Sequence, residues 1–185
     1  MVMLWVLGGV VVLVALWAAG VYNGLVQLNV RGEGAWSDVN VQLKRRYDLI
    51  PNIVETVKGY AAHERQTFQQ VTEARTRAMQ ATLPDQKGAA ENQLTATVKS
   101  LFAVAENYPQ LKANENFLGL QRSLTEIEAA IEESRRYYNA VVRDYNTKLE
   151  VIPDRFVAQI GGFHRRDFFQ LGTPEEGQAV RVSFN

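Results

Sequence analysis

The stretch AWSDVNVQLKRRYDLIPNIVETVKGYAAHERQTFQQVTEARTRA, residues 35–78, decides the fold class of this chain. Its apolar residues recur at steps of mostly three and four, which is the spacing of one face of an α-helix. Pro51 lies inside this pattern, and because the apolar face continues in phase beyond it, we expect a kink there rather than an end. The apolar face consists of Trp36, Val39, Leu43, Tyr47, Ile50, Val54, Val57, Ala61, Phe68, Val71 and Ala78.

Two more amphipathic helices are predicted after this stretch, over residues 86–107 and 114–151. Pro84 can start the first of them and Pro109 ends it. A short helix is expected over residues 154–160. The sequence therefore predicts an all-α fold, an antiparallel bundle of long amphipathic helices. The helix over residues 114–151 carries a heptad pattern formed by Phe117, Leu120, Leu124, Ile127, Ile131, Ser134, Tyr138, Val141 and Tyr145.

The first thirty residues carry no charged side chain, and residues 1–20 are almost wholly apolar. About twenty apolar residues suffice for a helix to cross a bilayer. Trp5 and Trp17 lie near the two ends of the run, as aromatic side chains at membrane interfaces do. A cleaved signal peptide is the alternative, with the small residues 18–20 as its cleavage site. The absence of Lys or Arg at the start and the length of the run favour a single transmembrane helix.

The charges that flank this run all follow it, beginning with Arg31. The positive-inside tendency therefore favours a cytoplasmic over a periplasmic domain at the bacterial inner membrane. We predict a transmembrane anchor over residues 1–22, a junction over 23–34 made flexible or kinked by its glycines, a helical bundle over 35–170 and a tail over 171–185. The tail is expected to be extended, because Val180, Val182 and Phe184 alternate with polar residues.

Composition excludes several functional classes. Twenty basic residues balance twenty acidic ones, so we expect no nucleic acid as a partner. The chain has no cysteine, which excludes disulfides, thiolate metal sites and thiol catalysis. The basic residues gather in small groups that we interpret as solvated helix faces. These groups are Lys44 to Arg46, Arg135 with Arg136, and Arg165 with Arg166.

Catalytic motifs are missing from the sequence. His63 and Glu64 resemble the start of a zinc-protease motif, but Thr67 occupies the place of the second histidine. Glu64 falls on the apolar face, where we expect it to be partly exposed and paired with an arginine. We predict no catalytic residue, no cofactor-binding residue and no metal ligand, and hence no enzyme. An enzyme built around Glu64, His63, Arg45 and Arg46 stays open as an alternative.

Several segments together resemble the LemA family. They are YNGLV (22–26), AW (35–36), VQLKRRYDLIPNIVETVKGYAAHE (41–64), AENYPQLKANENF (105–117), YNAVVRDYN (138–146) and the GF…FF stretch (162–169). The resemblance implies a single-span bacterial membrane protein with an antiparallel bundle of long helices and no established enzymatic activity. A relative in magnetotactic bacteria is linked to the formation of intracellular membrane compartments, which fits a role in membrane organisation.

The predicted function is that of a non-enzymatic scaffold or interaction protein anchored in the bacterial envelope. Its expected partners are the lipid bilayer and either other copies of the chain or other membrane proteins. A sensory module that binds a ligand or peptide between its helices is the alternative. Asn139 and Asn146 lie one heptad apart beside the apolar pattern, and we interpret them as fixing helix register rather than as binding a ligand.

Overall fold

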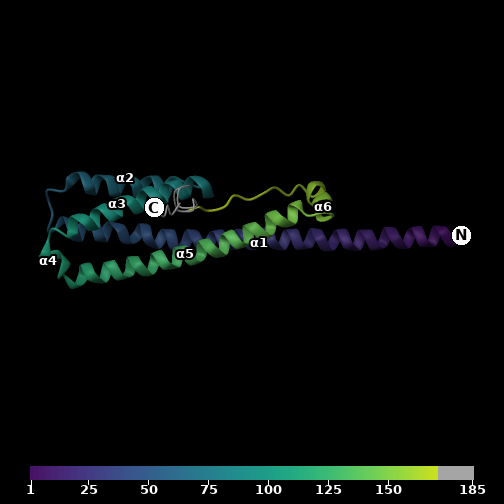
Figure 1. The fold of residues 1–185 in the computed structure, drawn as a ribbon, viewed down its shortest axis with the longest axis horizontal. Helices are drawn as coiled ribbons and strands as arrows, with labels where there is room; N and C mark the ends of the chain where they lie inside the picture. Colours follow the sequence, from purple (N-terminus) through teal and green to yellow (C-terminus); the bar gives the residue numbers. More distant parts are fainter. Residues whose placement is uncertain (171–185) are drawn as a thin grey trace, which may run out of the picture. The chain divides into compact units, whose positions relative to one another are not determined.

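The computed structural model describes residues 1–170, and every regular element within them is a helix (Figure 1). The predicted all-α fold is confirmed. The predicted extended tail, residues 171–185, lies outside the described residues. The helices are α1 (Val2–Lys58), α2 (Arg65–Gln80), α3 (Pro84–Ala105), α4 (Pro109–Lys112), α5 (Glu115–Glu150) and α6 (Asp154–Ile160).

The described chain forms two compact units, and α1 and α5 contribute to both. One unit contains residues 1–39 and 134–167, and the other contains residues 40–133 and 168–170. α1 is a continuous helix through the predicted junction at 23–34. Gly32 is buried there, and a Cβ atom added to it would lie 3.4 Å from Arg166. This glycine therefore admits the arginine side chain against the helix.

The second unit is a bundle in which the long helices α1, α2, α3 and α5 alternate in direction from one to the next along the chain. Arg75 in α2 donates from Nε to the carbonyl oxygen of Tyr47 in α1 at 2.7 Å, so α2 returns along α1. α3 and α5 follow, and the rings of Phe102 and Phe117 meet with centroids 5.8 Å apart near the connection between them. Residues 40–133 thus have the antiparallel arrangement that the sequence predicts.

The expectation of one helix over residues 35–78 is wrong, because the chain turns between Lys58 and Arg65. The turn is held by backbone hydrogen bonds, from Tyr60 to Val57 at 3.0 Å and from Glu64 to Ala61 at 3.1 Å. Gly59, a poor helix former, begins it. The apolar spacing conceals the turn because seven residues, two helical turns, separate Ala61 from Phe68, and both side chains are buried.

The apolar faces predicted from spacing form the core. All members of the face over residues 35–78 are buried except Trp36, which is half-buried. In α5 the heptad positions are buried apart from Leu120 and Ser134, which are half-buried. In the first unit, α1, α5 and α6 share a cluster of buried side chains: Val21, Leu25, Tyr145, Leu149 and Ala158.

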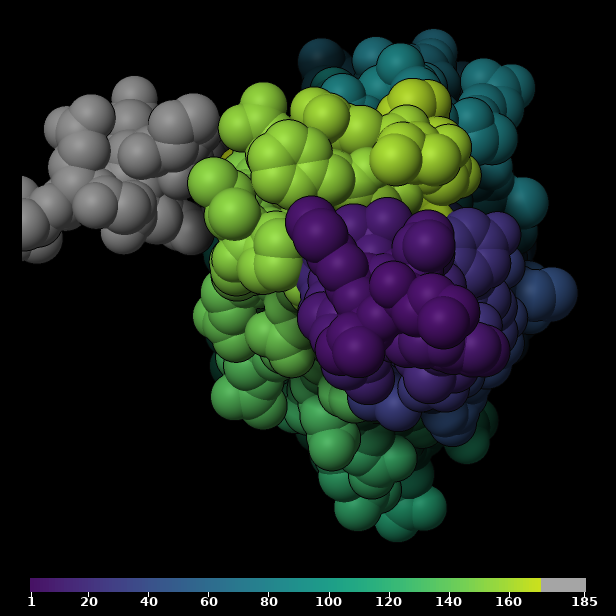
Figure 2. Space-filling view, turned by 90° about the vertical axis from the view of Figure 1, so that its right-hand side faces the viewer, coloured from purple at the N-terminus to yellow at the C-terminus, as the bar shows by residue number. Residues whose placement is uncertain are grey.

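The beginning of α1 makes a contrast with this core. Its apolar side chains from Val2 to Trp17 are exposed, and Figure 2, which looks onto the end that carries the N-terminus, shows the first of them in purple. By length and composition, this part of α1 could cross a membrane. The first buried side chain of α1 is Val21, which directly follows the apolar run.

Gly88 in α3 provides a test of how the C-terminal segment, residues 168–170, docks on the bundle. A Cβ atom added to this buried glycine would lie 2.1 Å from the backbone oxygen of Gln170, whose neighbour Phe169 is fully buried. Gly88→Ala is therefore expected to displace this segment and to lower the free energy of unfolding by about 1–3 kcal/mol, measured by denaturant titration.

The matched control is Gly119→Ala in α5, where an added Cβ atom would meet nothing within 4 Å. It should stabilise the protein by about 0.5–1 kcal/mol, since alanine favours the helix. Equal effects of the two substitutions would contradict the docking of the C-terminal segment on Gly88.

Candidate functional site

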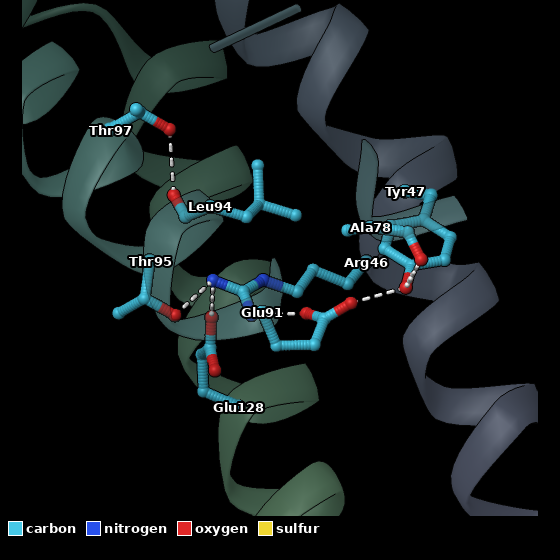
Figure 3. Close-up of polar contacts among 8 residues, drawn as sticks. All are labelled: Arg46, Tyr47, Ala78, Glu91, Leu94, Thr95, Thr97 and Glu128. Carbon is cyan, nitrogen blue, oxygen red and sulfur yellow. Dashed lines mark hydrogen bonds and ion pairs between the residues drawn. The ribbon is translucent and has the colours of Figure 1, made fainter. Parts of the chain in front are cut away.

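The bundle encloses a cluster of charged side chains, which is shown in Figure 3. The side chains of Arg46 in α1 and Glu91 in α3 are 2% and 0% exposed, and Nη1 of the arginine lies 2.9 Å from Oε2 of the glutamate. Nη2 of Arg46 donates to the hydroxyl of Thr95 at 2.8 Å and lies 3.0 Å from Oε1 of Glu128 in α5. One guanidinium group therefore joins three helices of the bundle.

Tyr47 and Lys87 complete this cluster. The Tyr47 hydroxyl donates to Oε1 of Glu91 and lies 3.2 Å from the backbone oxygen of Ala78 in α2. Both carboxylate oxygens of Glu91 thus have a partner. Nζ of Lys87 donates to the backbone oxygen of Ala81 at 2.9 Å and lies 5.9 Å from the centre of the Tyr47 ring, within the range of a cation–π contact.

Helical spacing explains how the sequence assembles these side chains. Lys87, Glu91 and Thr95 recur every four residues and therefore lie on one face of α3. Arg46 follows Leu43 by three residues and precedes Ile50 by four, so it lies on the buried face of α1.

Burial changes the proton affinities of the cluster. It raises the pKa of Glu91, an effect that the Tyr47 hydrogen bond and the charges of Arg46 and Lys87 oppose. Burial also raises the pKa of Tyr47, and the Glu91 carboxylate adds to this. Burial lowers the pKa of Lys87. The terminal nitrogens of Arg46 and both carboxylate oxygens of Glu91 are paired out of contact with solvent, although the buried Nε of Arg46 has no hydrogen-bond partner. This arrangement is suited to holding helices together rather than to binding a substrate.

The interpretation of the basic groups as solvated helix faces needs correction at Arg46, at Arg166 and at Arg135, the last of which is half-buried in α5. Lys44 and Arg45 are exposed as expected, but Arg46 is buried, because it points toward α3 and α5. Arg166 lies outside any helix and is half-buried. Its guanidinium donates to Oδ1 of Asn29 at 3.0 Å and pairs with Glu33 at 2.9 Å. The local runs of basic residues do not indicate the partners of Arg46 or those of Arg166.

The residues of the possible enzyme site are not brought together. His63 is exposed, and Glu64 is half-buried at the start of α2 without a side-chain hydrogen bond to that helix. Within residues 1–170, no ion pair joins Glu64 to an arginine. Arg46 lies twelve residues before the end of α1, about 18 Å along the helix. Nor does this part of the chain contain a group of three or more His, Asp or Glu side chains that could hold a metal ion.

A second polar arrangement holds the segment after α6 in the first unit. The side-chain amide of Asn146 donates to the backbone oxygen of Arg166 at 2.9 Å, and Oδ1 accepts from the Arg166 backbone N–H at 3.0 Å. The hydroxyl of Tyr138 donates to the backbone oxygen of Asp167 at 2.9 Å. Asn146 was expected to fix the register of helices, and it instead fixes an extended segment against α5.

Asn146→Ala should therefore leave both backbone groups of Arg166 without their partner. We expect the free energy of unfolding to fall by about 1–3 kcal/mol, because buried polar groups are costly when unpaired. Denaturant titration of the full chain in detergent measures this loss. Asn116→Ala, at an exposed position of α5, is the control and should change stability little. Equal stability of the two variants would contradict the role of Asn146.

The raised pKa of Tyr47 predicts a loss of stability in alkali. The ordinary pKa of tyrosine is 10.0. Above that pH the unfolded chain releases a proton that the folded chain retains, so the free energy of unfolding falls by up to about 1.4 kcal/mol per pH unit for this group. Tyr47→Phe should reduce the slope between about pH 10 and 12.

The exposed Tyr137 supplies the control for this measurement, as Tyr137→Phe should preserve the slope of the unmodified chain. Burial also raises the pKa values of Tyr138 and Tyr145, so part of the slope should persist in Tyr47→Phe. An identical slope in Tyr47→Phe and the unmodified chain would contradict the prediction.

The fold and the cluster define an all-helical protein in which a long apolar helix runs on into a bundle with a closed internal ion pair. The chain belongs to the LemA family, whose model matches residues 35–184. The resemblance inferred from the motifs is thereby confirmed. The match begins at Ala35, where the amphipathic stretch begins.

Curated relatives extend the comparison. The chain is 26% identical to magnetosome protein MamQ 2 of Paramagnetospirillum magneticum over 175 residues, and 24% identical to magnetosome protein MamQ of Magnetospirillum gryphiswaldense over 174 residues. Each alignment covers 80% of this chain and 64% of the relative. The chain therefore spans somewhat less than two thirds of the length of these relatives.

Proposed function

We propose that this protein is a non-enzymatic scaffold, anchored in the bacterial inner membrane by the start of α1, that works by contact with other copies of itself or with other membrane proteins. The observation that carries the proposal is the exposed apolar run of α1, which continues as one helix into the amphipathic bundle. An unbroken helix connects the membrane-crossing run to the bundle without a separate linker. This suits a protein that presents contact surfaces close to a membrane.

Two observations support a role without catalysis. In the charged cluster of the bundle, the terminal nitrogens of Arg46 and both carboxylate oxygens of Glu91 are buried and paired with other groups of the protein. The family and the magnetosome relatives are described without a reaction. These relatives are named as magnetosome proteins. For this chain, we propose a role in the organisation of membranes.

Sidedness is part of the proposal. Arg31 is exposed and is the first charged residue after the apolar run, which supports a bundle on the cytoplasmic side. Reporter enzymes fused to the C-terminus, one active only in the cytoplasm and one only in the periplasm, test this directly. Activity of the periplasmic reporter alone would reverse the orientation.

Self-association in a bilayer is the central test of the scaffold. Because the chain has no cysteine, Tyr137→Cys places one thiol at an exposed position of α5. Two samples labelled with donor and acceptor dyes and mixed in liposomes should show energy transfer that unlabelled protein competes away. Strictly monomeric protein in detergent and in nanodiscs, together with no cross-linked membrane protein in cells, would contradict the proposal.

A further inference from the structure

Helix α6 carries apolar side chains on two sides. On one side Ala158 is buried in the cluster with Val21 and Leu25 of α1, and Val157 packs against the same cluster. On another side, Phe156 and Ile160 are 58% and 90% exposed and lie four residues apart, on one face of the helix. Ile152, two residues before the start of α6, is also exposed. We call Ile152, Phe156 and Ile160 the α6 face.

Helix α6 packs on α1 close to the end of the apolar run, and this position indicates what the α6 face contacts. Its partners Val21 and Leu25 directly follow the apolar run, whose last residue is Gly20. Leu25 lies five residues beyond Gly20, about 7.5 Å along a helix. The ring of Phe163, just after α6, meets the Tyr22 ring edge-on with centroids 5.4 Å apart. α6 is therefore fixed at the level where the run would leave the membrane (Figure 1).

We propose that the α6 face lies in the boundary between headgroups and acyl chains of the same bilayer that α1 crosses, as a second membrane contact. This inference rests on the proposed anchoring by α1. A helix that lies in the interface buries apolar side chains at that boundary and carries cationic side chains that reach the headgroups. The contact would set the angle of the first unit to the membrane, since α1 alone permits rotation and tilt.

The charges beside the face fit this assignment. Arg155 in α6, with His164 and Arg165 after it, lines a groove of about 550 Å³ next to the helix. Glu150 also lines the groove and pairs with Arg165 at 2.6 Å. Arg155 and His164 are exposed and thus able to reach lipid phosphates.

A lipid surface also fits the size of the face better than a second protein does. A stable protein interface buries about 800 Å² on each partner, far more than three side chains supply. A bilayer needs no matched shape, and it is continuous with the surface that the apolar run of α1 occupies.

The experiment uses full-length chains with single cysteines, each carrying an environment-sensitive dye. They are reconstituted in liposomes of phosphatidylcholine and phosphatidylglycerol with or without a lipid that carries a quencher near its headgroup. The positions are Ile160→Cys on the α6 face, Gln159→Cys as the exposed neighbour on the same helix, and Leu13→Cys within the apolar run. We expect the dye at Ile160 to emit at shorter wavelength and to lose most of its fluorescence to the quencher, and the dye at Gln159 to lose much less.

Leu13→Cys separates the failure of this inference from the failure of the anchor. If the dye at Leu13 lies in lipid while the dye at Ile160 stays solvent-exposed, the anchor stands and the α6 contact is wrong. If neither dye lies in lipid, the proposed anchoring itself fails. A shielded but unquenched dye at Ile160 would indicate a protein partner and overturn the lipid assignment, as would equal quenching at Gln159 and Ile160.

Discussion

Arg46→Met is expected to lower the free energy of unfolding by about 3–5 kcal/mol, because Glu91 would then remain buried without its cationic partner. Methionine preserves much of the side-chain volume, so the loss of charge dominates the effect. The Tyr47 hydroxyl and Lys87 cannot provide the contacts of the lost guanidinium, whose terminal nitrogens contact Glu91, Thr95 and Glu128. Urea titration of the full chain in detergent, followed by circular dichroism, measures the change.

The neighbouring residue provides a matched control. Arg45 is exposed on the same turn of α1, and Arg45→Met should change stability by no more than about 0.5 kcal/mol. Combining Arg46→Met with Glu91→Leu should restore much of the lost stability, since removing both charges leaves an apolar pair. Arg46→Met with the stability of Arg45→Met would show that the buried pair does not hold the bundle together.

The effect matters beyond stability because the cluster joins elements far apart in the sequence. Arg46, Glu91 and Glu128 belong to α1, α3 and α5, and Tyr47 adds a contact to the end of α2. Apolar contacts tolerate sliding of one helix along another, whereas a buried ion pair has its partners in one register only. We infer that the cluster selects the register of the bundle, so the recovered double variant should unfold less cooperatively than the unmodified chain.

The helices themselves could be predicted from the sequence because burial follows local spacing. The heptad positions of α5 and the apolar face of α1 each repeat within one helix, and the repeat requires no knowledge of the partner. Pro84 likewise coincides with the start of α3, whereas Pro109, which was predicted only to end that helix, begins the short helix α4. The turn at residues 59–64 could not be predicted from the apolar spacing. Ala61 and Phe68 are separated by the equivalent of two helical turns, so the apolar residues before and after the chain reversal stay in phase.

The charged cluster could not be predicted in this way because its signal is spread over distant residues. In the sequence, Arg46 is one residue of a basic run, and its partner Glu91 lies 45 positions further on. Its spacing from Leu43 and Ile50 is the local hint that this arginine faces the core. Asn146 shows the same limit, since its partner is the backbone of Arg166, which carries no signal in side-chain patterns.

Release from the membrane is the largest effect that we expect, and it follows from two aspartates in the apolar run. Val11 and Val14 are exposed near its middle. An aspartate at the centre of a membrane-spanning helix costs about 2.5–3.5 kcal/mol, so Val11→Asp with Val14→Asp should oppose insertion by about 5–7 kcal/mol. The double variant should leave the carbonate-resistant membrane fraction of cells and appear in the soluble fraction.

The control places two aspartates at exposed apolar positions of the bundle instead of in the apolar run. Val41 in α1 and Leu118 in α5 are exposed there, and Val41→Asp with Leu118→Asp should leave the chain in the membrane. Equal unfolding transitions of the released and control variants would show that release reflects the loss of the anchor and not of the fold. The α6 face should not retain the released chain, because three apolar side chains give only weak, reversible binding to lipid. A double variant that stays in the carbonate-resistant fraction would therefore place the attachment elsewhere than in the start of α1.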